Sequence, residues 1–177
     1  MKRKEEFVPG LCNVLVKNKL YSKEEAKELE KSFTESSQTQ FDNFLLDEGL
    51  IDKEDLLKAL SDYYQTPALD ITGYFFQTFL LRKFPKFVMI QNLFIPLEID
   101  QNFMSIVTAN PANPDLYTII GKYVSHDLSF YVSTTQDIIN GIQEFYNKSM
   151  AEAGEMLYDE YIDDDDIYRM AVSEEEE

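Results

Sequence analysis

The sequence has 177 residues, of which 44% are hydrophobic and 14% aromatic, so it can bury the core of one domain or of two small ones. A single cysteine, Cys12, excludes a disulfide framework and a cysteine-based zinc site. The formal net charge of −17 argues against nucleic-acid binding, which depends on Lys and Arg side chains that neutralise phosphates.

The acidity is concentrated in the C-terminal part of the chain. Residues 151–177 contain 12 Asp or Glu and one Arg, whereas residues 1–150 carry a net charge of −6. The basic start, Met1 to Lys4, resembles the start of a signal peptide, but Pro9 and Gly10 interrupt the apolar run that would have to follow. Because no window approaches the roughly 18 apolar residues of a membrane helix, we expect a cytoplasmic chain without membrane insertion.

An internal repeat with an offset of 30 residues organises the first third of the chain. Residues 11–25 and 41–55 align, and five pairs are identical: Asn13/Asn43, Leu15/Leu45, Leu20/Leu50, Lys23/Lys53 and Glu24/Glu54. In both copies, apolar residues at helical spacing precede a turn and a second helix. The repeat therefore predicts two helical hairpins over residues 10–64, with both leucine pairs, 15/45 and 20/50, buried at equivalent positions.

Turn and cap residues support the predicted hairpins. Gly49 suits the left-handed residue that closes a helix, and Lys19 holds the same place at a higher cost. Ser22 and Glu25 form the pattern of a capping box at the start of the second helix, and Asp52 with Asp55 imitates it in the second copy.

The following residues predict a small α/β unit of about three strands. Pro67–Ile71 reads as an extended connector, followed by helices over about 75–83, from Pro85 onward, and over about 116–123. Strands are expected at 93–99, 103–108 and 129–133, and Pro96 makes the first an edge or bulged strand. Thr134 or Thr135 caps a last helix that continues toward Tyr161.

The predicted fold class is therefore α+β: an N-terminal pair of helical hairpins packed with a small C-terminal α/β unit. We divide the chain into a helical double-hairpin repeat (1–65), the α/β unit (66–148) and an acidic tail (149–177). Partial disorder is expected in the tail, which ends in Asp163–Asp166 and Glu174–Glu177. Apolar residues among its acids leave two interpretations open, a solubilising tail or a segment that docks on a basic partner.

Four stretches resemble, in order, the N-terminal domain of type II secretion and type IV pilus assembly ATPases, also called the GspE/PilB N-terminal or MshEN domain. They are the doubled hairpin, residues 84–97, residues 103–115 and residues 134–146, and together they extend over roughly residues 9–147. The resemblance implies a regulatory domain that works within a secretion or pilus-type machine.

The sequence departs from the family pattern in two respects. It contains no Gly-x-x-x-x-Gly-Lys-Ser/Thr, so we expect a stand-alone, degenerate domain without an ATPase motor. Members that bind cyclic di-GMP begin each repeat with Arg-Leu-Gly and end it with Gln, whereas here the repeats begin at Gly10 and Gln40 and end at Phe33 and Tyr63. Since a dianionic ligand favours guanidinium partners, cyclic di-GMP is not the expected ligand.

The sequence thus predicts a non-catalytic interaction or regulatory module that binds a protein partner, with no cofactor, no metal and no catalytic residues. The alternative is a cyclic di-nucleotide sensor with altered contacts, whose candidate ligand residues are Gln40, Asp42, Leu46, Gly49 and Tyr63. His126, the only histidine, is interpreted as a surface turn residue rather than a catalyst, and Cys12 as a small buried residue.

Overall fold

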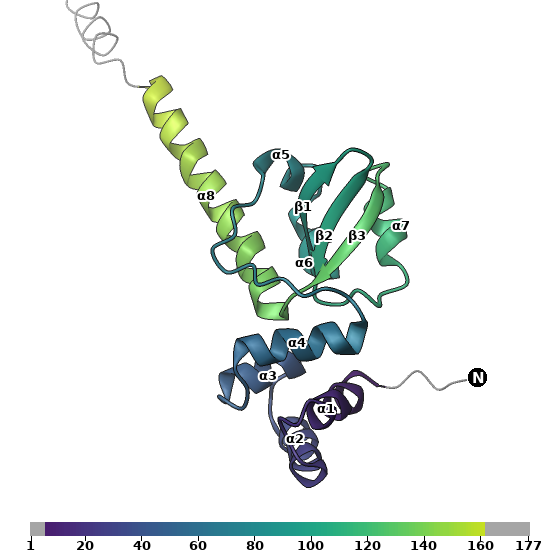
Figure 1. The fold of residues 1–177 in the computed structure, drawn as a ribbon. Helices are drawn as coiled ribbons and strands as arrows, with labels where there is room; N and C mark the ends of the chain where they lie inside the picture. The colour runs from purple at the N-terminus through teal and green to yellow at the C-terminus, as the bar shows by residue number, and fades with distance from the viewer. Residues whose placement is uncertain (1–5, 162–177) are drawn as a thin grey trace, which may run out of the picture. The chain divides into compact units, whose positions relative to one another are not determined.

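The computed structural model describes the backbone of residues 6–161 and the side chains of residues 6–148 and 150. The chain divides into two compact units, Met1–Ile142 and Gln143–Glu177. The first unit contains a helical half, residues 7–64, and an α/β half, residues 67–142, which confirms the predicted α+β class (Figure 1). The described elements are α1 (Phe7–Lys17), α2 (Lys23–Glu35), α3 (Phe41–Asp47), α4 (Lys53–Tyr64), α5 (Thr78–Leu81), α6 (Lys86–Asn92), β1 (Phe94–Asp100), β2 (Phe103–Thr108), α7 (Leu116–Gly121), β3 (Asp127–Val132) and α8 (Thr135–Tyr161).

The two helical hairpins turn in the same way, as the repeat predicts. Lys19 and Gly49 are both left-handed, with φ of 61° and 63°. The backbone N–H of Leu20 donates to the carbonyl of Leu15 at 3.0 Å, and Leu50 donates to Leu45 at 2.9 Å. These bonds satisfy the last carbonyls of α1 and α3, so each first helix ends in the same hydrogen-bonded turn.

One of the two predicted leucine pairs is buried and the other is not. Leu15 and Leu45 lie fully inside the helical core, but Leu20 is 36% exposed and Leu50 is half-buried. The predicted burial of Leu20 is wrong because the next residue, Tyr21, packs against the core instead. The Tyr21 hydroxyl also donates to the Leu50 carbonyl, which ties the turn of the second copy to the first.

The helix starts differ between the copies. Ser22 and Glu25 form the predicted capping box, with the Ser22 N–H donating to the Glu25 carboxylate at 2.7 Å. Asp52 makes no such side-chain cap bond, so the box expected there is wrong. Asp55 is one methylene shorter than Glu25, which leaves its carboxylate too short to reach back to the backbone of the capping residue.

A three-stranded sheet of order β1-β2-β3 forms the centre of the α/β half (Figure 1). β1 and β2 are antiparallel, and their register shifts between Pro96 and Glu98. Pro96 therefore lies beside a bulge on an edge strand, as its missing N–H predicts. β2 and β3 are parallel, and α7 lies in the crossover between them.

The connector after α4 is extended, and it also pairs with the sheet. Ala68 forms a parallel bridge with Val132, Leu69 N–H donates to the Val132 carbonyl at 3.0 Å, and Val132 N–H donates to Pro67 at 2.9 Å. Since Val132 also packs in the helical core, the end of β3 is shared by both halves of the first unit.

The helix predicted over residues 75–83 is reduced to the four residues of α5. Before α5, Gly73 has a φ of 70° and Phe76 packs so closely against α8 that a Cβ on Gly141 would lie 3.1 Å from its ring. This tertiary packing overrides the local helical preference, and it leaves the neighbouring Phe75 exposed.

α8 begins at the predicted cap, because the Thr134 hydroxyl accepts a hydrogen bond from the Asp137 N–H at 3.2 Å. Its described part extends to Tyr161, so the helix continues beyond Tyr146 as expected. The acidic runs 163–166 and 174–177 lie outside the described residues. Within residues 6–161, no helix is long and apolar enough to cross a lipid bilayer.

Candidate functional site

A pocket of about 620 Å³ opens between the helical half and the loop at residues 109–114. Its wall contains three of the predicted ligand residues, Gln40, Asp42 and Tyr63. Leu46 and Gly49 do not line it: Leu46 packs against the helical core, and Gly49 closes the turn after α3. We call this cavity the Gln40 pocket.

Asp42 is a structural residue of this pocket. Its side chain is buried, with 4% exposed, and its Oδ2 accepts a hydrogen bond of 2.7 Å from the backbone N–H of Thr135. Its Oδ1 accepts from the N–H of Asn43 at 3.0 Å. The carboxylate satisfies one of the free amides at the positive end of α8, so it holds the helical half to the α/β half.

Aromatic rings form one side of the Gln40 pocket. The ring centroids of Phe7 and Tyr63 are 5.4 Å apart, those of Phe7 and Tyr64 5.9 Å, and those of Tyr63 and Tyr64 4.7 Å. Burial, with smaller effects of Tyr63 and Asp42, raises the pKa of Tyr64 well above its usual value. Tyr64 is thus a neutral phenol across the physiological range, and this wall adds no charge to the pocket.

Gly10 makes room for this aromatic wall. A Cβ at residue 10 would lie 2.5 Å from Cε2 of Tyr63, closer than side chains approach one another. The position that the family resemblance gives to arginine at the start of the first repeat therefore faces the ring of Tyr63 here.

The charge of the Gln40 pocket is unfavourable for a phosphate. Among its described lining residues, Glu6 and Asp42 are acids and none is Lys or Arg. Backbone and amide groups of the loop, including Asn110 and Asn113, complete the wall. The sequence marks this loop as a family motif but does not indicate that it belongs to the site, because only the folded chain brings it to Gln40.

A second polar contact joins the helical half to α8. The Lys53 ammonium lies 2.6 Å from Oδ2 of Asp137, an atom buried in the fold, and 3.1 Å from Oδ1 of Asp70. Burial alone lowers the pKa of Lys53, but the hydrogen bonds and charges of Asp137 and Asp70 outweigh it and raise this pKa above its usual value. Lys23, the repeat equivalent of Lys53, is exposed on α2.

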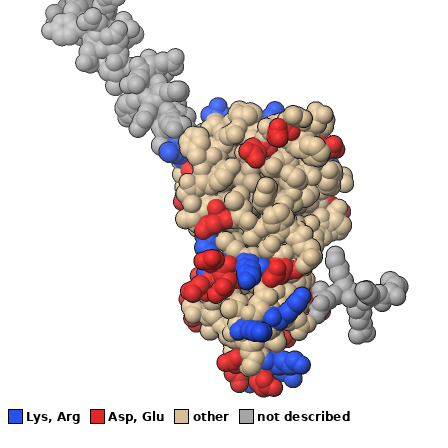
Figure 2. Space-filling model, viewed as in Figure 1, with Lys and Arg blue, Asp and Glu red and all other residues tan. Residues whose placement is uncertain are grey.

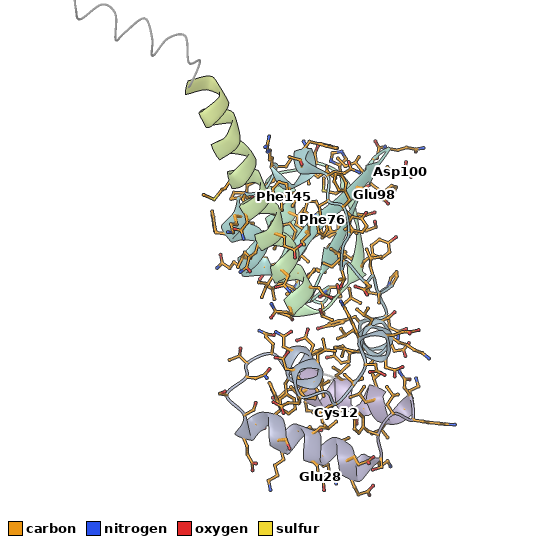
Figure 3. The ribbon with its side chains drawn as sticks, turned by 90° about the vertical axis from the view of Figure 1, so that its left-hand side faces the viewer. Cys12, Glu28, Phe76, Glu98, Asp100 and Phe145 are labelled. Carbon is orange, nitrogen blue, oxygen red and sulfur yellow. The ribbon has the colours of Figure 1, made fainter. Side chains whose placement is uncertain are left out.

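Cys12 is buried as predicted, whereas His126 lies before β3 as expected but is less exposed than a surface residue. Cys12 is buried between the helices (Figure 3), and burial, assisted by Glu30, raises the pKa of its thiol to about 12. His126 is half-buried in the turn before β3. Within the described part of the chain, no group of three or more His, Cys, Asp or Glu residues is arranged to hold a metal ion.

Two solved structures of known proteins share the fold of this chain. The structure of MshE with cdg (cyclic di-GMP) is similar to this chain, with a TM-score of 0.61 and 13% identity over 77% of this chain and 98% of that one. The structure of the N-terminal domain of XpsE is also similar, with a TM-score of 0.52 and 13% identity over 80% of this chain and 97% of that one. At 13% sequence identity, these structural similarities show that the fold is shared and nothing more.

Residues 64–152, half of the chain, match the MshEN domain family. The chain belongs to this family, which confirms the predicted resemblance to the N-terminal domains of secretion and pilus assembly ATPases. The search of the curated proteins found no match.

Proposed function

We propose that this chain is a non-catalytic regulatory module that binds a protein of a secretion or pilus-type machine. The observation that carries the proposal is a set of phenylalanines that the fold leaves uncovered. Phe75, Phe79, Phe87 and Phe103 are 85%, 59%, 66% and 54% exposed, and all belong to the α/β half.

Exposed aromatic side chains of this size are unfavourable in water and are enriched in the centres of protein interfaces. Figure 2 shows that charged side chains gather over the helical half on the face in view, whereas the α/β half is mostly uncharged there. Protruding phenylalanines are typical anchors of protein interfaces, so this set favours a protein partner. The exposed Arg82, Lys83 and Lys86 lie close in sequence to Phe79 and Phe87 and would contribute the polar rim of such an interface.

Photo-crosslinking in the native host tests the proposal. A benzophenone amino acid at Phe79 or Phe87 should cross-link to a component of the machine, and the same probe at the exposed Lys58 on α4 should not. A Phe79→Ser/Phe87→Ser variant should lower the affinity for that component by about tenfold or more while the melting temperature changes little. Identical adducts from Phe79 and Lys58, or unchanged affinity, would contradict the proposal.

The second candidate function is a cyclic di-GMP sensor with altered contacts. It is supported by the fold shared with the MshE structure, which holds that ligand, and by the Gln40 pocket at the start of the second repeat. Isothermal titration with cyclic di-GMP discriminates between the candidates. The sensor requires saturable micromolar binding that a Gln40→Ala substitution weakens, whereas the protein-binding module requires none.

A further inference from the structure

A groove runs along the outer side of the helical half, between α2 and the end of α3. It has a volume of about 580 Å³, and its apolar floor is formed by Tyr21, Leu29, Phe44 and Leu50. Leu29 and Phe44 also belong to the helical core, so the floor is rigidly packed from below. We call this cavity the α2 groove.

The α2 groove has the length of a short helix. One wall is a single face of α2 from Glu25 to the C-cap residue Ser36, and its lining residues recur at intervals of three and four. At a rise of about 1.5 Å per residue, this face extends for roughly 16 Å, or three helical turns. Grooves of this shape receive apolar residues at i, i+3 or i+4, and i+7 of an amphipathic helix.

The rim of the α2 groove is acidic. Four glutamates line it, Glu25, Glu28, Glu35 and Glu48, and none of its lining residues is Lys or Arg. All four are exposed (Glu28 points away from the helical core in Figure 3), so they are available to a partner.

Two of these carboxylates already have partners within the chain. Glu25 accepts the capping bond of Ser22, and Glu35 lies 3.8 Å from the Lys31 ammonium in an exposed pair that contributes little. Glu25 keeps its negative charge in that bond, so all four glutamates contribute to the negative potential of the groove. Glu28 and Glu48, which line the groove from α2 and from the end of α3, can be replaced without removing the cap of α2 or the Lys31–Glu35 pair.

We infer that the α2 groove binds an amphipathic helical segment of a partner protein that carries Lys or Arg beside its apolar face. The apolar floor would receive the hydrophobic residues of the segment, and the glutamates would pair with its basic residues. This inference goes beyond the proposed function, because it assigns a second surface in the helical half, independent of the phenylalanines of the α/β half.

The probe for this surface is a fluorescent peptide of about 15 residues, with leucine at helical spacing and lysine elsewhere. Binding is measured by fluorescence anisotropy at low salt. Two control peptides accompany it: one has glutamate in place of lysine, and the other has the same composition with leucine at every second position. Only the basic peptide with helical spacing should bind, and its amide chemical-shift changes should fall in residues 25–36 and 44–50.

A charge-reversed pair of variants separates specific docking from general attraction. Glu28→Lys/Glu48→Lys should weaken peptide binding by about tenfold or more, and Glu28→Gln/Glu48→Gln by less. The matched control, Glu98→Lys/Asp100→Lys, makes the same change in net charge on exposed residues of β1 (Figure 3) and should weaken binding by no more than about threefold. Circular dichroism establishes that each variant is folded.

Several outcomes would overturn the inference. Equal losses in the groove and control variants would show attraction by net charge only, and equal binding of the peptide with alternate leucines would exclude a helical occupant. Chemical-shift changes in the Gln40 pocket would assign the peptide elsewhere. Self-association of the wild type that Glu28→Lys/Glu48→Lys abolishes would assign the groove to a second copy of the chain. If the probe at Phe79 cross-links to a component of the machine but the basic peptide does not bind the α2 groove, the proposed function stands and only this inference is wrong.

Discussion

Lys19 and Gly49 adopt the same left-handed backbone conformation, 30 residues apart, at the ends of α1 and α3. A side chain with a Cβ costs roughly 1–2 kcal/mol in this conformation, and glycine avoids most of that cost. We therefore expect Lys19→Gly to raise the free energy of unfolding by about 0.5–1 kcal/mol after the greater entropy of glycine in the unfolded chain is subtracted.

The reciprocal change provides the matched control. Gly49→Ala should lower the free energy of unfolding by about 1 kcal/mol, although nothing lies within 4 Å of the added Cβ. Urea unfolding of the three proteins measures both changes. A destabilising Lys19→Gly would show that the lysine side chain, rather than the backbone, determines this turn.

The contact between Asp42 and Thr135 predicts a second pair of effects. Asp42→Ala removes the acceptor from a buried amide at the start of α8, so it should lower the free energy of unfolding by about 1–3 kcal/mol. Asp42→Asn keeps an acceptor of similar shape and should cost less. Asp47→Asn, an exposed change on the same helix, should remain within about 0.5 kcal/mol of the wild type.

Hydrogen exchange provides a local measure of the same contact. The amide of Thr135 should exchange much faster in Asp42→Ala than in the wild type, while amides within β1 and β2 should change little. Uniform acceleration throughout the first unit would show that Asp42 contributes only to global stability.

The ion pairs of Lys53 predict a pH-dependent contribution to stability. A hydrogen bond from the Thr72 N–H, with contributions from the Thr72 side chain and Lys53, lowers the pKa of Asp70 below its usual 3.8. The stability contributed by Asp70 is therefore fully present above pH 3.8 and is lost as the pH falls through the lower pKa of the folded state. The raised pKa of Lys53 gives a contribution that is present below pH 10.5 and lost as the pH rises through the folded-state value.

Lys53→Met should accordingly lower the free energy of unfolding by about 0.5–1 kcal/mol near neutral pH, a modest effect because the pair is partly exposed. The difference from wild type should shrink at about pH 3, where the unfolded-state carboxylates are protonated. Lys23→Met, the equivalent change in the first repeat, should have little effect at either pH. Equal destabilisation near neutral pH and at about pH 3 would show that the methylene chain of Lys53, rather than its charge, stabilises the fold.

The glycine opposite Tyr63 predicts a steric effect on the Gln40 pocket. Gly10→Ala forces the Tyr63 ring to move, so we expect a loss of about 1–3 kcal/mol in the free energy of unfolding and a change in Tyr63 fluorescence or ring NMR signals. Gly121→Ala places a Cβ in open space in α7 and should not destabilise the fold. Wild-type stability and unchanged ring signals in Gly10→Ala would contradict the close approach.

Local signals predicted much of the fold correctly, because they depend on neighbours in sequence. The left-handed turn at Gly49, the capping box at Ser22 and the irregular strand at Pro96 all follow from backbone chemistry within a few residues. The predictions are wrong where contacts between residues far apart in the sequence determine which side chain is buried or how long a helix is. Tyr21 takes the buried place expected for Leu20, and the packing of Phe76 on α8 shortens the helix at α5.

The same distinction applies to the candidate site. Gln40, Asp42 and Tyr63 were identified by their positions in the repeat, and the structure brings these three into one pocket. Their role in ligand binding and the division at residues 65/66 and 148/149 stay predictions. Asp42 illustrates the limit: its partner is Thr135, 93 residues away, and no pattern in the sequence relates the two.

The two repeats no longer have equivalent neighbours, and this limits how the domain can change. Asp42 and Lys53 contact α8 and the connector, whereas their counterparts Cys12 and Lys23 lie in the helical core and in solvent. The same substitution at these equivalent positions should therefore have different effects in the two copies, although both copies keep the same turn. The two copies share the geometry of their turns, but their side chains have different partners, so one copy could not replace the other in this fold.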